Sequence, residues 1–237
     1  MTTQQILTLR PATARGIADF GWLKSAHSFS FGNYHDPEHR QFGALRVIND
    51  DVVAGGGGFP SHPHQDAEIF SYVLEGALEH KDSMGNGSVV GEGGVQYMSA
   101  GRGVTHSEFN PSETDQMRFL QVWLLPNEQG GEPAYETMNI TADDKRGKLK
   151  LFLSQDGRQN SITSRAKANV YAATLDGEER IEHELGSTPK AWIQVARGEV
   201  QLNGQPLTTG DGVAITGGGT LELENGVNAE ILLFELL

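Results

Sequence analysis

The 237-residue chain contains no cysteine. A disulfide framework, a thiol nucleophile and a thiolate metal site are therefore excluded. Long apolar runs are also missing, since no window approaches the 18 apolar residues of a membrane-spanning helix. The N-terminus is polar and lacks the basic and apolar segments of a targeting peptide. We expect a cytoplasmic protein that does not associate with membranes.

Clusters of basic residues are equally scarce. The formal net charge is -13, and no run of lysine and arginine is longer than two residues. A protein that binds nucleic acid usually carries a basic patch, because neutralisation of phosphates dominates its affinity. Direct nucleic-acid binding is therefore not expected, and the negative charge is better explained as an aid to solubility.

Helical periodicity is lacking as well. From residue 40 to residue 125, short apolar segments alternate with turns, and no long segment repeats every 3.6 residues. The chain has 30 glycines and 9 prolines, and most glycines lie in short clusters that suit chain reversals. The sequence therefore predicts an all-β protein, with enough chain for a sizeable core.

Two segments of the first half recur weakly in the second half. Residues 192–202 echo residues 69–78, and residues 210–218 echo residues 93–101. An internal repeat favours two similar β-domains over one large domain. A linker-like stretch of proline, glutamate and glycine supplies the boundary between them. The predicted domains are residues 1–131 and residues 132–237.

A His-x-His pair, His62 and His64, is the strongest chemical signal in the sequence. In an extended strand, side chains two residues apart point to the same face, so the two imidazoles would lie side by side. His106 and Glu108 repeat this spacing about 40 residues later. Three imidazoles and one carboxylate suit Fe(II), Mn, Co, Ni, Cu or Zn, and would leave two positions of an octahedral metal open.

The second half of the repeat lacks these side chains. When the second half is aligned with the first without gaps, Glu184, Gly186 and Glu224 stand at the positions of His62, His64 and His106. The only histidine of the second half, His183, lies one residue before the position that corresponds to His62. Three histidines of the first half, His27, His35 and His39, have no ligand spacing and are expected to be structural or surface residues. We therefore predict one metal site, in the first domain.

The sequence closely resembles the cupin superfamily and, within it, the pirin family. Gly56-x5-His62-x-His64-x3-Glu68 matches the first cupin motif, and His106-x3-Asn110 matches the end of the second motif. Four segments carry the more specific likeness to pirins: Phe59–His64, Tyr72–Gly76, Met98–Gly103 and His106–Glu108. The likeness is strong over the first 130 residues and looser beyond them.

This resemblance implies a bicupin of two stacked antiparallel β-sandwich or jelly-roll barrels. It also implies one non-haem iron, Fe(II), held by His62, His64, His106 and Glu108. The alternation of side chains along a strand does not decide whether Glu108 or Glu68 is the carboxylate ligand. Glu68 shares its strand face with His64, and the glutamate at this position is the ligand in other cupins. If Glu108 is the ligand, we expect Glu68 to orient an imidazole.

Bacterial members of the family resemble quercetin 2,3-dioxygenases. We therefore expect a monomeric metal dioxygenase acting on a flavonol and O₂ with release of carbon monoxide. In this hypothesis the 3-oxygen of the flavonol occupies an open metal position and Glu108 is the catalytic residue that accepts the 3-hydroxyl proton. A redox-sensing regulatory protein without turnover is the alternative, and a sugar- or metabolite-active cupin is a third possibility.

Overall fold

The computed structural model describes residues 5–186 and 190–237, and almost all of its regular structure is β-strand. The chain forms two compact units. The N-terminal unit comprises Gly16–Ile140 together with Ser164–Ala166. The C-terminal unit comprises the preceding segment up to Arg15, Thr141–Thr163, and the chain from Lys167 onward. The predicted all-β class is confirmed.

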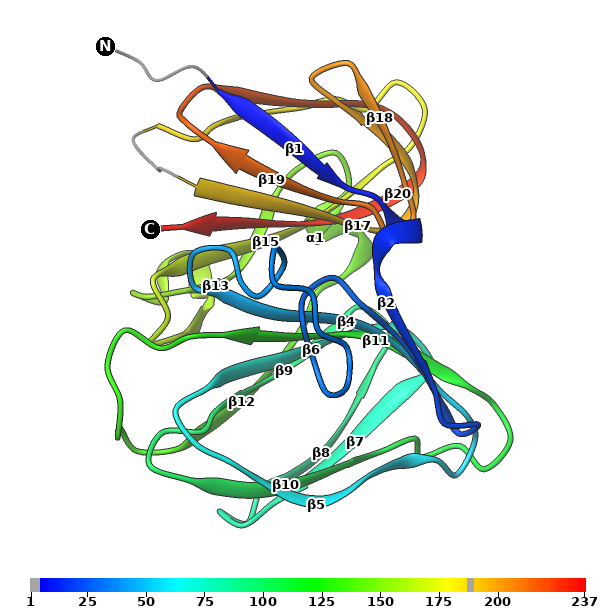
Figure 1. The fold of residues 1–237 in the computed structure, drawn as a ribbon, viewed down its shortest axis with the longest axis vertical. Coiled ribbons are helices and arrows are strands. Elements are labelled where there is room, and N and C mark those ends of the chain that lie inside the picture. Colours follow the sequence, from blue (N-terminus) through cyan, green and yellow to red (C-terminus); the bar gives the residue numbers. More distant parts are fainter. Residues whose placement is uncertain (1–4, 187–189) are drawn as a thin grey trace. The chain divides into compact units, whose positions relative to one another are not determined.

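The N-terminal unit consists of two antiparallel sheets, formed by the strands labelled β2 to β12 in Figure 1. The seven-stranded sheet has the order β12-β9-β6-β11-β4-β3-β2, and the four-stranded sheet has the order β5-β10-β7-β8. Their bounds are β2 (Gly16–Asp19), β3 (Leu23–His27), β4 (Leu45–Val53), β5 (Gly58–His64), β6 (Glu68–Glu75), β7 (Ala77–Asp82), β8 (Gly87–Gly91), β9 (Gly94–Ser99), β10 (Val104–Phe109), β11 (Met117–Leu124) and β12 (Ala134–Asn139). The two sheets enclose apolar side chains, among them Leu78, Val73 and Phe119.

The C-terminal unit contains one nine-stranded sheet with the main order β1-β19-β17-β20-β15-β13-β14; in addition β16 pairs with β20 and β18 with β17. Its elements are β1 (Ile6–Arg10), η1 (Ala12–Ala14), α1 (Ala142–Lys145), β13 (Lys150–Ser154), η2 (Arg158–Asn160), β14 (Ile162–Thr163), β15 (Ala168–Leu175), β16 (Ile181–Glu184), β17 (Lys190–Leu202), β18 (Gln205–Thr208), β19 (Gly212–Thr216) and β20 (Thr220–Leu236). Aliphatic side chains fill its core. Among the described residues, no helix has the length and apolar character needed to span a bilayer.

The two units divide the chain differently from the predicted domains 1–131 and 132–237. β1 pairs with β19 and so belongs to the C-terminal unit, although it begins the chain. β12 pairs with β9 and so belongs to the N-terminal unit, although it follows residue 131. Both differences arise from strand pairing between distant segments, which a pattern of local apolar residues does not encode.

Close backbone approach before the His pair, which the four glycines Gly55 to Gly58 suggest, is present in the structure. A Cβ atom at Gly58 would lie 2.3 Å from a ring carbon of Phe109 and 2.6 Å from the carbonyl oxygen of Glu108. Only glycine therefore allows β5 to run against β10 at this point. This contact sets the pairing of the two strands that carry the three histidines.

Candidate metal centre

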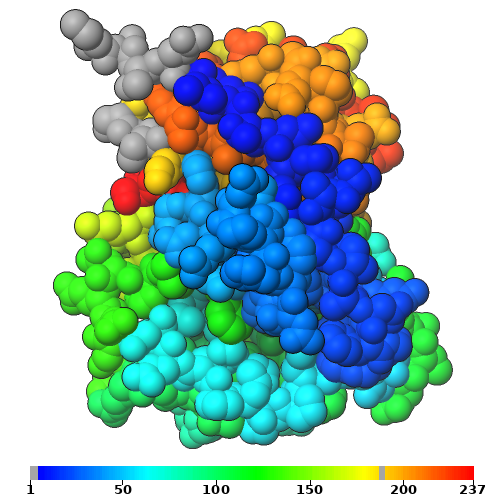
Figure 2. Space-filling view, viewed as in Figure 1, coloured from blue at the N-terminus to red at the C-terminus, as the bar shows by residue number. Residues whose placement is uncertain are grey.

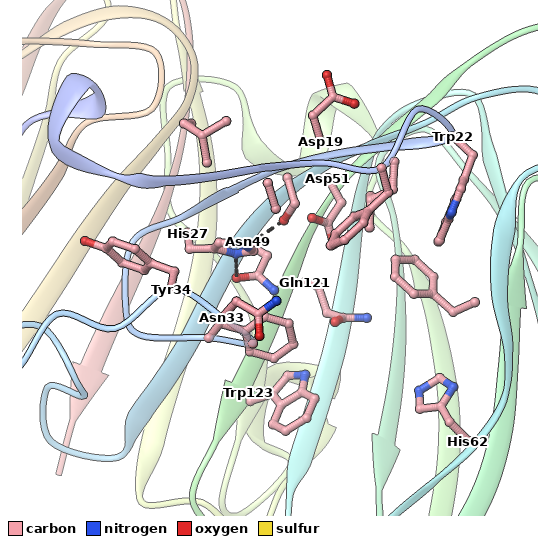
Figure 3. Close-up of a pocket in the computed structure, with 18 of the residues that line it drawn as sticks. Asp19, Trp22, His27, Asn33, Tyr34, Asn49, Asp51, His62, Gln121 and Trp123 are labelled. Carbon is pink, nitrogen blue, oxygen red and sulfur yellow. Dashed lines mark hydrogen bonds between the residues drawn. The ribbon is translucent and has the colours of Figure 1, made fainter.

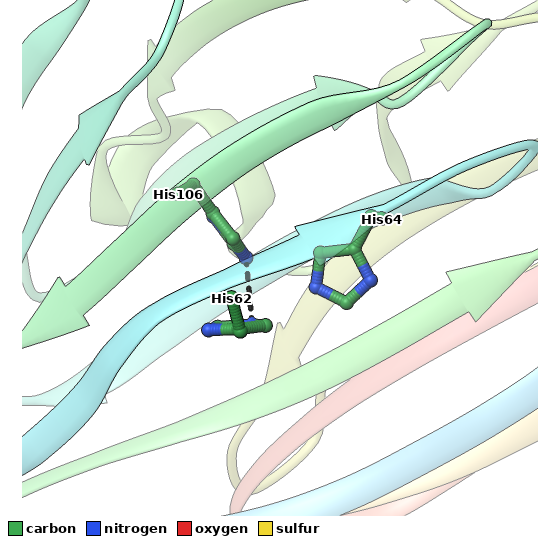
Figure 4. Close-up of side chains that lie close together, drawn as sticks. All are labelled: His62, His64 and His106. Carbon is green, nitrogen blue, oxygen red and sulfur yellow. Dashed lines mark hydrogen bonds between the residues drawn. The ribbon is translucent and has the colours of Figure 1, made fainter.

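His62, His64 and His106 meet on two paired strands of the four-stranded sheet. His62 lies directly opposite His106 in the β5–β10 register, and His64 lies opposite Val104. The Nε2 atoms of His62 and His106 are 3.1 Å apart. The ring of His64 completes the cluster, with centroids 4.7 Å from His62 and 4.9 Å from His106 (Figure 4). The predicted trio is thus brought together.

The three rings form a ligand set that fits a divalent metal. One nitrogen from each ring lies within 4.8 Å of the others, so the three nitrogens surround a common point. Burial, together with neighbouring imidazoles, lowers the pKa of His64 to about 4 and that of His106 to about 3. His64 and His106 are therefore neutral at physiological pH, and each keeps the lone pair that a metal ligand needs.

Glu108 lies two residues after His106, beyond a register shift between β10 and β5. Its fully buried carboxylate accepts hydrogen bonds from Ser71 Oγ at 3.1 Å, from Gln121 Nε2 at 2.9 Å and from Gln96 Nε2. Burial raises the pKa of Glu108 to about 7, although these three donors act in the opposite direction. A carboxylate oxygen of Glu108 shares a cluster with His106 and His80 rather than with all three histidines.

Glu68, the alternative carboxylate, is engaged elsewhere. Its carboxylate accepts hydrogen bonds from the hydroxyls of Tyr97, Ser99 and Ser164, and from the backbone N–H of Arg165. These contacts attach the Ser164–Ala166 segment to the N-terminal unit. They also differ from the expected role of Glu68 in orienting an imidazole, because all four donors are hydroxyl or backbone groups.

His80 is a candidate functional residue that does not stand out in the amino-acid sequence. Its Nδ1 lies 3.4 Å from Nδ1 of His106, its Nε2 lies 3.2 Å from Oδ2 of Asp82, and its ring stacks on Tyr135 at 4.2 Å. His80 therefore supports the face of His106 that points away from His62. The available signal was strand alternation, since His80 and Asp82 share the inward face of β7 with the buried Leu78.

Two of the other early histidines, His39 and His27, have structural partners. His39 contacts the carboxylate of Asp36 at 2.9 Å. His27 is buried, and its Nδ1 lies 2.8 Å from Oδ1 of Asn49. His27 nevertheless also lines a cavity, so its surroundings have functional interest that its spacing did not suggest.

A cavity of about 790 Å³ opens beside His62 and His64 within the N-terminal unit. The strands and loops of the seven-stranded sheet form most of its wall, and β5 forms the rest (Figure 3). In the space-filling view, the blue surface of the early segments borders the cyan surface of β5 on this face of the unit (Figure 2). Aromatic and aliphatic lining residues include Ile17, Trp22, Phe31, Phe59 and Trp123, and polar lining residues include Ser25, His27, Asn49, Asp51 and Gln121.

Asp50 and Asp51 are neighbours on β4 with contrasting environments. Asp50 forms a bidentate ion pair with Arg118, with distances of 2.8 and 3.0 Å. Asp51 is fully buried, hydrogen-bonds Ser25, and lies near the carboxylates of Asp50 and Glu108. Burial raises the pKa of Asp51 to about 7. At high pH, the folded protein therefore carries a buried charge that costs stability.

We expect Asp51→Asn and Asp50→Asn to change the stability of the metal-free protein in opposite directions. Because the folded-state pKa of Asp51 is raised from 3.8 to about 7, its contribution to stability falls as the pH rises through this window. At pH 8, Asp51→Asn should therefore raise the free energy of unfolding by about 1–3 kcal/mol, after the cost of burying the amide. Asp50→Asn should lower it by about 1–3 kcal/mol, since the bidentate ion pair with Arg118 is lost.

Thermal unfolding at pH 4 and pH 8 tests this pair. The gain of Asp51→Asn should be present at pH 8 and nearly absent at pH 4, where the carboxyl is protonated in the folded state and about half protonated in the unfolded state. A lower unfolding temperature of Asp51→Asn at pH 8 would contradict the assigned burial cost.

Comparison with known proteins identifies the relatives of this chain. The family model described as Pirin matches residues 9–124, and the model described as Quercetinase C-terminal cupin domain matches residues 151–236. The quercetin 2,3-dioxygenase of Escherichia coli (strain K12) is 45% identical over 231 residues, which cover 98% of this chain and 99% of that protein. A pirin-like protein of Caulobacter vibrioides is 37% identical, with 95% of this chain and 97% of that protein covered.

A solved structure extends this comparison. The bacterial pirin YhhW from Escherichia coli, crystallised in complex with nickel(II), superimposes with a TM-score of 0.92 at 43% identity. The match covers 98% of this chain and 99% of that one. The expected bicupin fold is confirmed by these matches over both halves of the chain.

Proposed function

The chain belongs to the pirin family, and on this premise we propose that it is a metal-dependent dioxygenase that cleaves flavonols such as quercetin. One observation carries the proposal: three imidazoles cluster, and two of them, His62 and His64, line a cavity large enough for a planar three-ring substrate. His62, His64 and His106 would hold the metal, with Glu108 as the fourth ligand or the adjacent base. The protein would act as a monomer.

The residues around the cavity suit the steps of this reaction. A divalent metal bound by the imidazoles supplies Lewis acidity that lowers the pKa of a nearby substrate hydroxyl. Glu108, whose pKa is about 7, is matched to accept the 3-hydroxyl proton near neutral pH. Ser71, Gln96 and Gln121 hold its carboxylate in place. In the overall reaction both atoms of O₂ enter the products and one ring carbon leaves as carbon monoxide.

The identity of the metal is a separate part of the proposal. We propose Fe(II), because an imidazole and carboxylate set with open positions suits it. The nickel(II) in the related YhhW supports a divalent metal in general and suggests a site that accepts several metals. Imidazole also suits zinc and copper, so the donor set alone does not select one metal.

Anaerobic reconstitution tests the activity. Protein loaded with Fe(II), Mn, Co, Ni or Cu under nitrogen is mixed with quercetin, and the flavonol absorbance is followed before and after air is admitted. We expect the absorbance to persist under nitrogen and to decay after air is admitted, with release of carbon monoxide. Failure with all five metals would remove the dioxygenase proposal and favour the regulatory alternative, which a pull-down from reduced and oxidised protein would then test.

A further inference from the structure

The wall of the cavity that faces His62 and His64 is unusually polar for the interior of a β-sandwich. The β3–β4–β11 register aligns Ser25 with Asp51, and it aligns His27, Asn49 and Gln121 in the adjacent row. One row further along, the corresponding positions are the buried Leu23, Val53 and Met117, which belong to the apolar core. The sheet therefore changes from apolar to polar where it borders the cavity.

Most of these polar groups satisfy one another. Nδ1 of His27 lies 2.8 Å from Oδ1 of Asn49 and 3.3 Å from Oγ of Ser25, and Gln121 donates to Glu108. Within residues 5–186 and 190–237, two buried atoms of the cavity wall have no hydrogen-bond partner: Oδ1 of Asp51 and Nε1 of Trp123. One of these atoms is an acceptor and the other is a donor. Both are therefore available to a molecule in the cavity.

Asp51 is positioned for such a contact. It is only 2% exposed, yet it lines the cavity, and it reaches this space from β4 whereas His62 reaches it from β5 (Figure 3). Its carboxyl retains one hydrogen bond, to Ser25, and its other oxygen has none. A buried carboxyl that is half satisfied reduces stability. Its presence here is explained if a ligand completes the set.

The remaining walls define the shape of that ligand. Trp22 and Phe59 pack edge to face at 5.2 Å, and Phe31 and Trp123 do so at 5.6 Å. All four rings line the cavity. Such walls favour a flat aromatic molecule, while the acceptor on Asp51 favours a hydroxyl donor at the edge of that molecule.

We propose that Asp51 determines substrate specificity by accepting a hydrogen bond from a ring hydroxyl other than the 3-hydroxyl of the flavonol. The preferred substrates are then polyhydroxylated flavonols, and flavonols without peripheral hydroxyls bind weakly. This inference rests on the proposed function, because it places a flavonol between the histidines and the polar wall. It adds a contact that neither the metal nor Glu108 provides.

Binding measurements without oxygen test the inference independently of turnover. Metal-loaded wild type, Asp51→Asn and Asp51→Leu are titrated anaerobically with quercetin and with 3-hydroxyflavone, which carries only the 3-hydroxyl group. Quenching of the tryptophans of the cavity wall reports binding. Asp50→Asn is the matched control, since it removes the adjacent carboxyl from the other face of β4. Metal content is measured for each variant.

We expect Asp51→Leu to weaken quercetin binding about 10- to 100-fold, to leave 3-hydroxyflavone binding within about twofold, and to leave metal content unchanged. Asp51→Asn should give a smaller loss, because its amide oxygen still accepts. Asp50→Asn should bind both compounds as wild type does. A merely structural role for Asp51 would weaken both ligands equally and lower the unfolding temperature at pH 8.

Three outcomes separate this inference from the proposed function. Equal losses for both flavonols, or none for either, would overturn the role of Asp51. If the Asp51 variants selectively lose quercetin binding and the metal-loaded wild type shows no turnover in air, the role of Asp51 is supported and the dioxygenase proposal is overturned. A wild-type protein that binds neither flavonol would overturn both.

Discussion

We expect the His106→Ala protein to retain almost no bound metal while remaining folded. His106 is the central member of the trio: its Nε2 faces His62 and its Nδ1 faces His80. Loss of a partner that only orients a ligand already costs about 10- to 100-fold in metal affinity, and loss of the ligand itself should cost more. The C-terminal unit, which forms its own sheet without the trio, indicates that this type of fold does not require these side chains.

Metal analysis and thermal unfolding measure this effect. Protein purified without chelator should contain about one metal per chain in the wild type and only traces in His106→Ala and His62→Ala. Metal at 100 times its dissociation constant should stabilise the wild type by about 2.7 kcal/mol, and should not shift the unfolding of the variants. His183→Ala is the matched control, because His183 pairs with Glu235 in the C-terminal unit. Full metal content in His106→Ala would overturn the ligand assignment.

We expect Glu108→Gln to lose most turnover. The amide keeps the shape of the side chain but cannot accept the substrate proton, and loss of such a base typically costs about 10²- to 10⁴-fold in kcat. The amide group also presents an N–H donor where Ser71, Gln96 and Gln121 already donate, so the side chain loses a hydrogen bond. Steady-state oxygen consumption with quercetin, at equal metal content, measures the loss.

The Glu68→Gln variant, compared with Glu108→Gln, tests which of the two carboxylates serves the metal site. Its carboxylate serves the Ser164–Ala166 segment, so the substitution should lower the free energy of unfolding by about 1–3 kcal/mol while leaving metal content unchanged. Loss of metal in Glu68→Gln, with normal metal and turnover in Glu108→Gln, would instead assign the carboxylate role to Glu68. The two variants thus separate alternatives that strand parity leaves open.

Several features of this protein followed from the sequence because they depend on local spacing. The short apolar segments and glycine turns predicted an all-β fold. The His-x-His spacing of His62 and His64 predicted a shared face, because strand side chains alternate with a period of two. The repeated turn pattern predicted two related halves, and glycines at equivalent turns, Gly76 and Gly198, both adopt positive φ, at 72° and 67°.

Other features were decided only when distant segments met. Parity places Glu68 and Glu108 equally well, but the donors that surround each carboxylate give them different roles. His80 supports His106 because β7 pairs with β10, and spacing along one strand does not report such a neighbour. In the same way, Asp51 and its neighbour Asp50 look alike in sequence. Only the sheet register turns one carboxyl toward Arg118 and buries the other beside the cavity, because alternation fixes which face a residue takes and tertiary packing fixes what that face meets.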